Sequence, residues 1–293
     1  MRTGMMISAA VVFFLCLILF LYWNNKSIVI TEHVYESERL PKAFDGYRIT
    51  HVSDLQSEYF GKNQRNLIEK TAKTNPDIIV YTGDLLDRNH TDFDAARTAM
   101  EGLLTIAPVY YINGNHEMAV EETAMNVFYE ELEAMGVSVL FDRGVEVTKD
   151  EAAICLMGLS EHTVFGCKGF IRDNSAPLDM DMLQEALDGL RGQAAKSGFS
   201  ILLAHEPQYL DAYAAAGFDL IFAGHAHGGQ IRLPFTDGLY APGQGVLPKL
   251  ASGMHRKEGT ALVISRGLGN STFPFRVFNR PEIVAVKLLY GNN

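Results

Sequence analysis

Cysteine is scarce in this chain, which has only Cys16, Cys155 and Cys167 among its 293 residues. Cys16 lies in an apolar stretch, so at most one disulfide bridge can form, and a disulfide framework is excluded. The chain also has no Cys-x-x-Cys pair, which argues against a thiolate zinc site. With 47% hydrophobic residues, a chain of this length can bury a core without such support.

An excess of basic residues is absent as well. The sequence has 25 Lys and Arg residues against 35 Asp and Glu residues, for a formal net charge of −10. Proteins that bind nucleic acids usually present a basic face to the phosphates, so we expect no nucleic-acid partner. The acidic balance does not exclude a small phosphorylated substrate, because bound metal ions would reverse the charge of a site locally.

One long hydrophobic run stands out, from Met5 to Trp23. At about 1.5 Å per residue, a helix over this run is roughly 28 Å long, enough to cross the apolar core of a bilayer. Tyr22 and Trp23 end the run where aromatic residues commonly meet the membrane interface. A cleaved signal peptide is the alternative, but the Tyr-Trp-Asn-Asn-Lys that ends this segment is a poor cleavage site.

We therefore predict a single-pass transmembrane anchor at residues 1–26 and one globular domain at residues 27–293. Arg2 and the amino terminus precede the hydrophobic run, Lys26 follows it, and acidic residues come soon afterwards. This small positive-inside bias favours an amino terminus inside the cell. It places the globular domain outside the cytoplasm, at the cell membrane.

Short apolar runs alternate with helical patterns along the rest of the chain. This alternation predicts an α/β domain whose sheet is covered on both faces. The strand-rich C-terminal part predicts a second sheet packed on the first. Strands are expected at 27–34, 47–52, 77–81, 109–112, 137–141, 145–147, 152–159, 199–204, 219–223, 230–233, 260–266 and 283–289, and helices at 63–73, 93–104, 121–135, 180–195 and 209–215.

Side chains of the kind that bind metal ions follow five of these strands. Taken alone, an aspartate after a strand is usually a helix cap or a turn former. A His-x-His pair is stronger evidence, because side chains two residues apart on an extended segment point to the same side. Ligands bind at the carboxyl ends of strands in α/β sheets, so the whole set predicts one metal site. The set consists of Asp54, Asp84, Asn115, His205, His225 and His227.

The order and spacing of these residues resemble the calcineurin-like metallophosphoesterase superfamily. The matching motifs are Ser53-Asp54-Leu55, Gly83-Asp84-Leu85-Leu86-Asp87-Arg88, Gly114-Asn115-His116-Glu117, His205 and Gly224-His225-Ala226-His227. Three more motifs are similar to those of its membrane-anchored bacterial YkuE/YaeI-type branch. They are Phe60-Gly61-Lys62-Asn63-Gln64, Gly228-Gly229-Gln230-Ile231 and Ser265-Arg266-Gly267-Leu268-Gly269. Together the motifs cover nearly the whole chain after the anchor, but they do not name a substrate.

The resemblance implies a fold and a cofactor. The fold is a four-layer α/β/β/α sandwich of two mixed sheets, and the cofactor is a pair of divalent metal ions. The ions would be Mn, Zn or Fe, with Mn favoured. The implied ligands are Asp54 and His227 for the first ion, Asn115, His205 and His225 for the second, and Asp84 as the bridge between them.

The resemblance also implies catalytic and substrate-binding roles, with Asp84 and His116 as the catalytic residues. His116 would face the phosphate and either stabilise developing charge or protonate the leaving oxygen. Asn115 and His116 would contact the substrate. Arg88 is a candidate phosphate contact, and a solvated position or an ion pair with Asp87 is the alternative. Glu117 or another carboxylate could orient a ligand imidazole from behind.

One position departs from the family pattern. The first motif is normally Asp-x-His, and Gln56 stands where that histidine would bind the first metal. A glutamine carbonyl is neutral, harder and a weaker partner for zinc or iron than imidazole. Gln56 could ligate the ion and favour manganese, a water could fill the place, or the first ion could be lost. We count Gln56 among the ligands and expect either that it binds the ion or that a water fills the place. His51 is expected to be a core or supporting histidine.

The leading interpretation is a metal-dependent phosphoric ester hydrolase. It would cleave a phosphodiester or pyrophosphate bond by attack of a metal-bound hydroxide. Because the anchor would hold the site near a bilayer, we expect a phosphorylated small-molecule or lipid substrate of the cell envelope. Lys168, Arg172 and Arg276 could bind an anionic headgroup.

Two alternatives remain at this stage. One is a nucleotide phosphodiesterase or a phosphomonoesterase. The other, from a different class, is a degenerate membrane-tethered binding module that holds metal poorly, for which Gln56 is the only support in the sequence.

Overall fold

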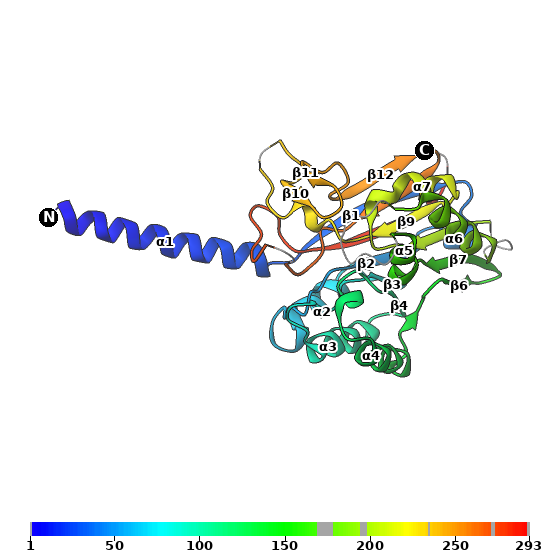
Figure 1. Ribbon diagram of the computed structural model, residues 1–293, viewed down its shortest axis with the longest axis horizontal. Coiled ribbons are helices and arrows are strands. Elements are labelled where there is room, and N and C mark those ends of the chain that lie inside the picture. The colour runs from blue at the N-terminus through cyan, green and yellow to red at the C-terminus, as the bar shows by residue number, and fades with distance from the viewer. Residues whose placement is uncertain (1, 169–177, 194–197, 234, 271–272, 292–293) are drawn as a thin grey trace.

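The computed structural model describes residues 2–168, 178–193, 198–233, 235–270 and 273–291. Helix α1 (Arg2–Lys26) projects from one end of the globular part (Figure 1). Its stretch Met5–Lys26 is long and apolar enough to cross a membrane, and its most apolar window is not buried against the rest of the chain. By length and composition, α1 could therefore serve as a membrane anchor or as a signal sequence.

Two mixed six-stranded sheets form the centre of the molecule. In the first, one pair of neighbouring strands is antiparallel and the other pairs are parallel; in the second, the pair at each edge is antiparallel. The first sheet has the order β1 (Val29–Ser37), β14 (Glu282–Tyr290), β2 (Arg48–Val52), β3 (Ile78–Thr82), β4 (Val109–Ile112) and β5 (Ser138–Val139). The second has the order β12 (Gly253–Lys257), β13 (Thr260–Ile264), β9 (Leu220–Ala223), β8 (Ser200–Leu203), β7 (Ala152–Gly158) and β6 (Arg143–Lys149).

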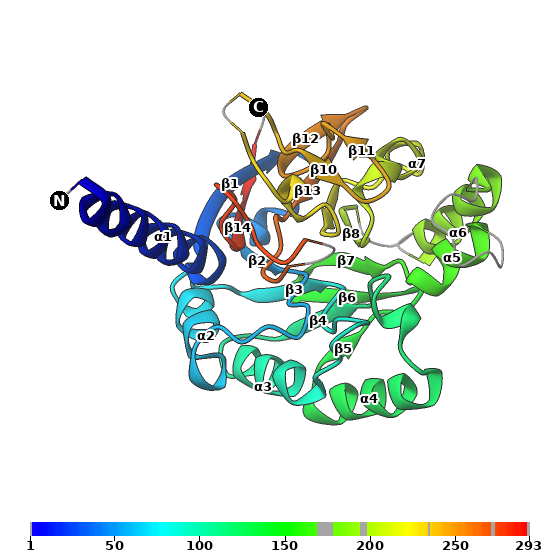
Figure 2. The ribbon, with the colours of Figure 1, turned by 60° about the vertical axis from the view of Figure 1, so that its left-hand side comes forward.

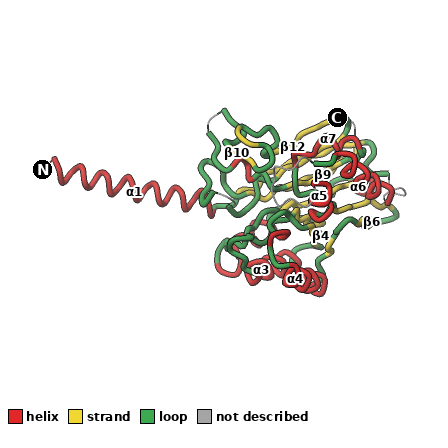
Figure 3. The backbone as a smooth tube through the Cα atoms, in the orientation of Figure 1, coloured by secondary structure: helices red, strands yellow, loops and turns green. Residues whose placement is uncertain are grey.

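Helices cover the outer face of each sheet, which makes four layers (Figures 2 and 3). The first sheet is covered by α2 (Arg65–Ala72), α3 (Phe93–Leu104) and α4 (Glu122–Met135). The second is covered by α5 (Glu161–Lys168), α6 (Met180–Gln193) and α7 (Leu210–Ala215). A small ribbon of β10 (Tyr240–Ala241) and β11 (Gly245–Val246) lies apart from both sheets, and single 3₁₀ turns occur at Lys42–Phe44, Lys62–Gln64, Glu117–Ala119, Pro207–Tyr209 and His227–Gly229.

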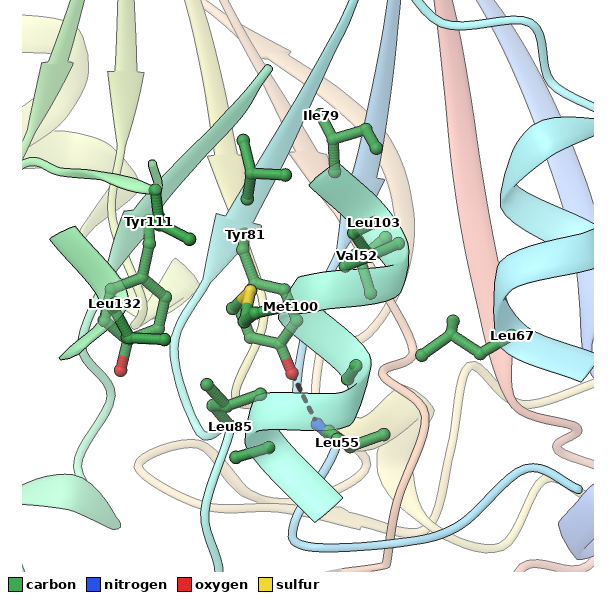
Figure 4. Packing of buried hydrophobic residues seen from close by; sticks show 14 of the residues in the cluster. Val52, Leu55, Leu67, Ile79, Tyr81, Leu85, Met100, Leu103, Tyr111 and Leu132 are labelled. Atoms are coloured by element: carbon green, nitrogen blue, oxygen red, sulfur yellow. Dashed lines mark hydrogen bonds between the residues drawn. The ribbon is translucent and has the colours of Figure 1, made fainter. Parts of the chain in front are cut away.

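The alternation of side chains along β3 shows how the layers are filled. Ile78 and Val80 pack between the two sheets, whereas Ile79 and Tyr81 pack under the helices. This period of two is what a strand covered on both faces requires. On the helix side, the Tyr81 hydroxyl accepts a hydrogen bond from the backbone N–H of Leu55 at 3.1 Å (Figure 4). The core thereby fixes the backbone next to Asp54.

The predicted α/β fold with two mixed sheets is confirmed, and so are most of the predicted elements. The strand expected at 230–233 is wrong: only an isolated bridge from Ile231 to Val277 is present there. The chain turns at this point, because Gly228, Gly229 and Gln230 all have positive φ. Helix α5 and strand β12 were not predicted, and the strand expected at 137–141 shortens to the two residues of β5.

Candidate metal centre

The six predicted ligands meet at one place, where both sheets present the carboxyl ends of parallel strands. Strands β2, β3 and β4 are parallel neighbours in the first sheet, and β8 and β9 are parallel neighbours in the second. Their ends face one another, so five separate segments contribute to one site. All six side chains are buried: Asp54, Asp84, Asn115, His205, His225 and His227.

Several ligands have an unusual backbone conformation. Asp54, Asp84, His225 and His227 have φ values of 54°, 51°, 64° and 46°. The left-handed region is uncommon for residues with a side chain, and such strained conformations persist mainly at functional sites. Gln56, with a φ of 53°, belongs to the same group. The chain thus turns sharply at or just after the strand ends that carry the ligands.

Two glycines allow the segments to approach closely. A Cβ on Gly224 would lie 2.1 Å from Ser53 Oγ and 2.4 Å from Asp54 Oδ2. A Cβ on Gly114 would lie 2.3 Å from Asp84 Oδ1. Any larger residue at either position would displace a ligand carboxylate, so the glycines of these two motifs have a steric function.

The second predicted metal position is a compact group of nitrogen and oxygen atoms. One ligand atom each from Asp84, His205 and His225 lies within 4.8 Å of the others. The Asn115 Oδ1 atom lies 3.1 Å from His205 Nε2 and 2.8 Å from His225 Nδ1, and these two nitrogens are 3.2 Å apart. Lone-pair atoms converge in this way where a cation binds between them.

The tautomer of His205 suits this role. Its Nδ1 lies 2.7 Å from the carbonyl oxygen of Thr82, which can only accept a hydrogen bond. Nδ1 must therefore carry a proton in the hydrogen-bonded form. In the neutral ring, Nε2 is then left with its lone pair facing Asp84 and Asn115. A carbonyl behind the ring thus holds the histidine ready to bind a metal.

The first predicted metal position shares Asp84 with the second. One ligand atom each from Asp54, Asp84 and His227 again lies within 4.8 Å of the others. Gln56 completes this group, because its Nε2 donates to Asp84 Oδ2 at 2.7 Å. The Gln56 Oε1 and Asp54 Oδ2 atoms are buried without a hydrogen-bond partner. Buried acceptors rarely remain unpaired, so a cation fits here as well.

The first group is less well prepared for a metal than the second. Arg276 is fully buried, and its Nη2 lies 3.3 Å from His227 Nδ1. A guanidinium can only donate, so His227 Nδ1 is the acceptor and the proton of the neutral ring is on Nε2. That nitrogen lies 3.4 Å from Asp54 Oδ1. Binding of an ion through Nε2 would require this proton to leave or to move.

The buried charges of the centre perturb one another. Burial would raise the pKa of Asp84, but His205 and His116 outweigh it and hold that pKa below its ordinary value. Burial would lower the pKa of His205, but Asp84 outweighs it and raises that pKa well above the usual range. Burial, with help from Asp84, raises the pKa of Asp54 to about 6. Metal binding to such a site releases protons, because the ligands must be deprotonated.

Glu117 supports the centre in a way that the sequence did not specify. Its carboxylate accepts the backbone N–H groups of Asp84 at 3.0 Å, Leu86 at 2.9 Å and Gly114 at 2.8 Å. It therefore ties the second motif to the third through the backbone, whereas the expected partner was a ligand imidazole. Burial, reinforced by the charge of Asp84, raises the pKa of Glu117 to about 8.

His116 and Arg88 lie beside the two groups of ligands. The backbone N–H of His116 donates to Asp84 Oδ1 at 2.9 Å, and the ring Nε2 of His116 is 3.9 Å from Asp84 Oδ2. The backbone N–H of Arg88 donates to His116 Nδ1 at 3.3 Å, while the Arg88 side chain is exposed. His51 is buried with Nε2 2.7 Å from Thr82 Oγ1, as expected for a core histidine.

The three basic candidates for headgroup binding have different positions. Lys168 Nζ lies 2.8 Å and 2.9 Å from the two carboxylate oxygens of Glu206, so its charge is already paired. Arg172 lies outside the described residues. Arg276 is next to the first group of ligands, which no motif indicated, and its Nε and Nη1 have no hydrogen-bond partner. The sequence did not indicate this position, because Arg276 lies far along the chain from the motifs that carry the ligands.

Comparison with known proteins gives consistent matches. The family model described as Calcineurin-like phosphoesterase matches residues 47–229. The uncharacterized metallophosphoesterase YkuE of Bacillus subtilis is 30% identical over 276 residues, covering 92% of this chain and 89% of YkuE. Phosphodiesterase YaeI of Escherichia coli is 25% identical over 216 residues, covering 73% and 71%. Among solved structures, a phosphopantetheinyl hydrolase (PptH) from Mycobacterium tuberculosis matches with a TM-score of 0.44 and 13% identity, covering 75% of this chain and 89% of that one.

Proposed function

This chain belongs to the calcineurin-like phosphoesterase family, and from that premise we propose that it hydrolyses a phosphodiester or pyrophosphate bond in a lipid-linked or other envelope substrate. Membership makes it a metal-dependent phosphoric ester hydrolase with a buried His/Asp centre. The substrate, the metals and the residue roles below are the proposed part. The observation that carries the proposal is the pair of ligand groups that share Asp84.

Each ligand group has a distinct donor set. Asp54, Gln56, Asp84 and His227 would hold the first ion, mostly through oxygen atoms, which favours manganese. Asp84, Asn115, His205 and His225 would hold the second, with two imidazole nitrogens. When bound, such a pair of ions lowers the pKa of a water and clamps phosphoryl oxygens.

His116 would donate a proton to the substrate. Its Nδ1 accepts the Arg88 backbone N–H, so the neutral ring carries its proton on Nε2, on the side of Asp84. A donor at this place can protonate a leaving oxygen or stabilise charge on the phosphoryl group. Asn115 directs Oδ1 to the two imidazoles, which leaves its Nδ2 as a second donor. The exposed Arg88 side chain would reach the phosphate only after substrate binds.

The connection between α1 and the centre supports a substrate in the membrane. At the end of α1, the Asn25 Oδ1 accepts the backbone N–H of Arg276 at 2.8 Å, and Arg276 contacts His227. A membrane anchor in α1 would therefore place the centre close to the bilayer surface. We propose that the domain lies outside the cytoplasm. Protease added to intact spheroplasts would then digest it, and full protection would contradict this orientation.

Hydrolysis by the full chain, solubilised in detergent and loaded with manganese, tests the reaction class. Bis-p-nitrophenyl phosphate and p-nitrophenyl phosphate serve as a diester and a monoester. We expect release of p-nitrophenol from the diester and its loss in Asp84→Asn, which removes the shared carboxylate. A wild-type rate on both compounds no higher than that of Asp84→Asn would refute the proposed reaction. Faster turnover of the monoester would favour a phosphomonoesterase instead.

A further inference from the structure

An apolar cavity is formed by the loop that follows the ligand His227. Its volume is about 260 Å³, and it is lined by Gly229, Gln230, Ile231, Leu239, Tyr240, Pro242 and Phe273. Gly229 and Gln230 are only two and three residues beyond the ligand His227. None of the lining residues carries a charge, so the cavity does not suit the phosphate itself.

The cavity is a built part of the fold. The loop that follows His227 is folded back on itself, because the N–H of Leu239 donates to the carbonyl oxygen of Ile231 at 2.8 Å. A Cβ on Gly229 would lie 2.4 Å from the Cα of Gly238, so the two sides of the loop touch. Ile231 also forms a bridge to Val277, which joins this loop to the segment that carries Phe273.

Gln230 offers a polar group to the cavity that it lines. Its side chain is 94% buried, since its exposed fraction is 6%, and neither Nε2 nor Oε1 has a hydrogen-bond partner. A buried amide without partners destabilises the fold. A ligand that occupies the cavity could satisfy it with an ester or phosphate oxygen.

The cavity includes Tyr240 of strand β10, and this strand lies at the end of the molecule from which α1 leaves (Figure 1). Exposed apolar side chains on its two loops include Leu233, Tyr240, Leu247, Phe273 and Phe278. These loops contact α1 directly: the Phe278 ring centroid is 5.2 Å from that of Phe20, and Arg280 lies over Trp23. An apolar helix and an apolar rim on the same side suit contact with one bilayer.

We infer that this cavity binds the hydrocarbon chain of a membrane lipid phosphate whose phosphoryl group lies at the metal centre. This inference rests on the proposed phosphoesterase function and names its substrate class. The volume is slightly below the range of about 300–1,000 Å³ found for whole-ligand sites, so the cavity holds only the part of the chain next to the headgroup. The rest of the chain stays in the bilayer beneath the apolar rim.

The test uses the full chain in lipid nanodiscs with manganese and two diesters that share one leaving group. They are p-nitrophenyl methyl phosphate and p-nitrophenyl octyl phosphate. The quantity measured is the ratio of their kcat/KM values, octyl over methyl, in each variant. Partition of the octyl ester into the lipid raises this ratio equally in all variants, so differences between variants report the cavity.

In Leu239→Trp, which fills the cavity, we expect this ratio to fall by about tenfold or more, since each methylene that the cavity covers contributes about fourfold. Tyr240→Asp, at a half-exposed position that tolerates a polar group, should lower the ratio as well. Tyr290→Trp, at an exposed aromatic position near the carboxyl terminus, is the matched control and should leave it unchanged.

The methyl ester separates the two ideas, because it does not reach the cavity. Hydrolysis of the methyl ester at wild-type rates in both variants, with an unchanged octyl-to-methyl ratio, would overturn the lipid-chain site and leave the phosphoesterase function intact. Absence of hydrolysis of both esters by the wild-type chain would instead overturn the proposed function. A lower ratio in the two cavity variants, but not in Tyr290→Trp, is the result expected.

Discussion

Substitution of Gln56 by alanine probes whether this residue takes the place of the missing histidine. Gln56 is 4% exposed, and its Nε2 donates to Asp84 Oδ2 at 2.7 Å. Its Oε1 is buried without a hydrogen-bond partner. The side chain can therefore hold the Asp84 carboxylate with its amino group and an ion with its carbonyl oxygen. Alanine removes both contacts.

The expected magnitude follows from these two contacts. A hydrogen bond to a charged group contributes about 1.5–3 kcal/mol, so the metal-free variant should unfold more easily by roughly that amount. Loss of a contact that orients a ligand costs about 10–100-fold in metal affinity. Gln56 belongs to the first group only, and this group is the one less well prepared for a metal. The weaker of the two manganese affinities should therefore fall by about 10–100-fold. The site formed by Asn115, His205 and His225 should change far less.

Isothermal titration of the chelator-treated full chain with manganese measures both affinities. Gln64→Ala is the matched control, because Gln64 is also a fully buried glutamine, but its amide bonds the backbone at Phe60 and Glu58. The Gln64→Ala substitution should lower the free energy of unfolding and leave both manganese affinities unchanged. If Gln56→Ala leaves both affinities at wild-type values, the glutamine is no ligand and the reasoning is refuted. Gln56→His should raise the affinity of the weaker site for zinc relative to manganese.

Three further predictions concern the centre and its support. In Asp84→Asn, manganese should no longer raise the melting temperature, because both ligand groups lose their shared carboxylate; scanning fluorimetry with and without chelator would show a retained shift if this is wrong. Glu117→Ala leaves three buried N–H groups without an acceptor, and each costs about 1–3 kcal/mol of stability. Urea unfolding of the metal-free chain should therefore show a free energy of unfolding lower by at least about 3 kcal/mol. A decrease under about 1 kcal/mol would contradict this role. Burial lowers the pKa of His51 from 6.5 to about 3, so the unfolded chain binds the extra proton and stability falls as the pH drops through this window. His51→Asn should lack this part of the acid sensitivity, about 2.3 kcal/mol between pH 6.5 and 4.5 in metal-free urea unfolding; identical pH profiles of the wild-type chain and the variant would contradict this role of His51.

Most of the secondary structure could be predicted because its local signals are strong. Helix α3 and strand β4 have the predicted bounds, Phe93–Leu104 and Val109–Ile112. The first is an amphipathic pattern capped by Asp92, which accepts the N–H groups of Asp94 and Ala95, and the second is a short apolar run. Both patterns persist because burial in the fold and local preference agree.

Prediction failed where distant contacts override the local pattern. The alternation of polar and apolar residues at 230–233 is typical of a strand, but positive φ at Gly228, Gly229 and Gln230 turns the chain away from both sheets. Helix α5 has little amphipathic pattern and contains Gly166; it forms because Val164 and Cys167 are buried in the core under the second sheet. Neither contact can be read from a window of neighbouring residues.

The sequence by itself indicated the residues that the fold brings together in the two ligand groups, because Asp, Asn and His side chains that follow strands whose ends meet are typical of a metal site. Only the tertiary structure decided how they are used. It gave His205 the tautomer that a metal requires and put Arg276 against His227. It also formed an apolar cavity from the loop that follows His227. These features depend on which segments lie side by side, and that is set by the packing of two sheets rather than by any local motif.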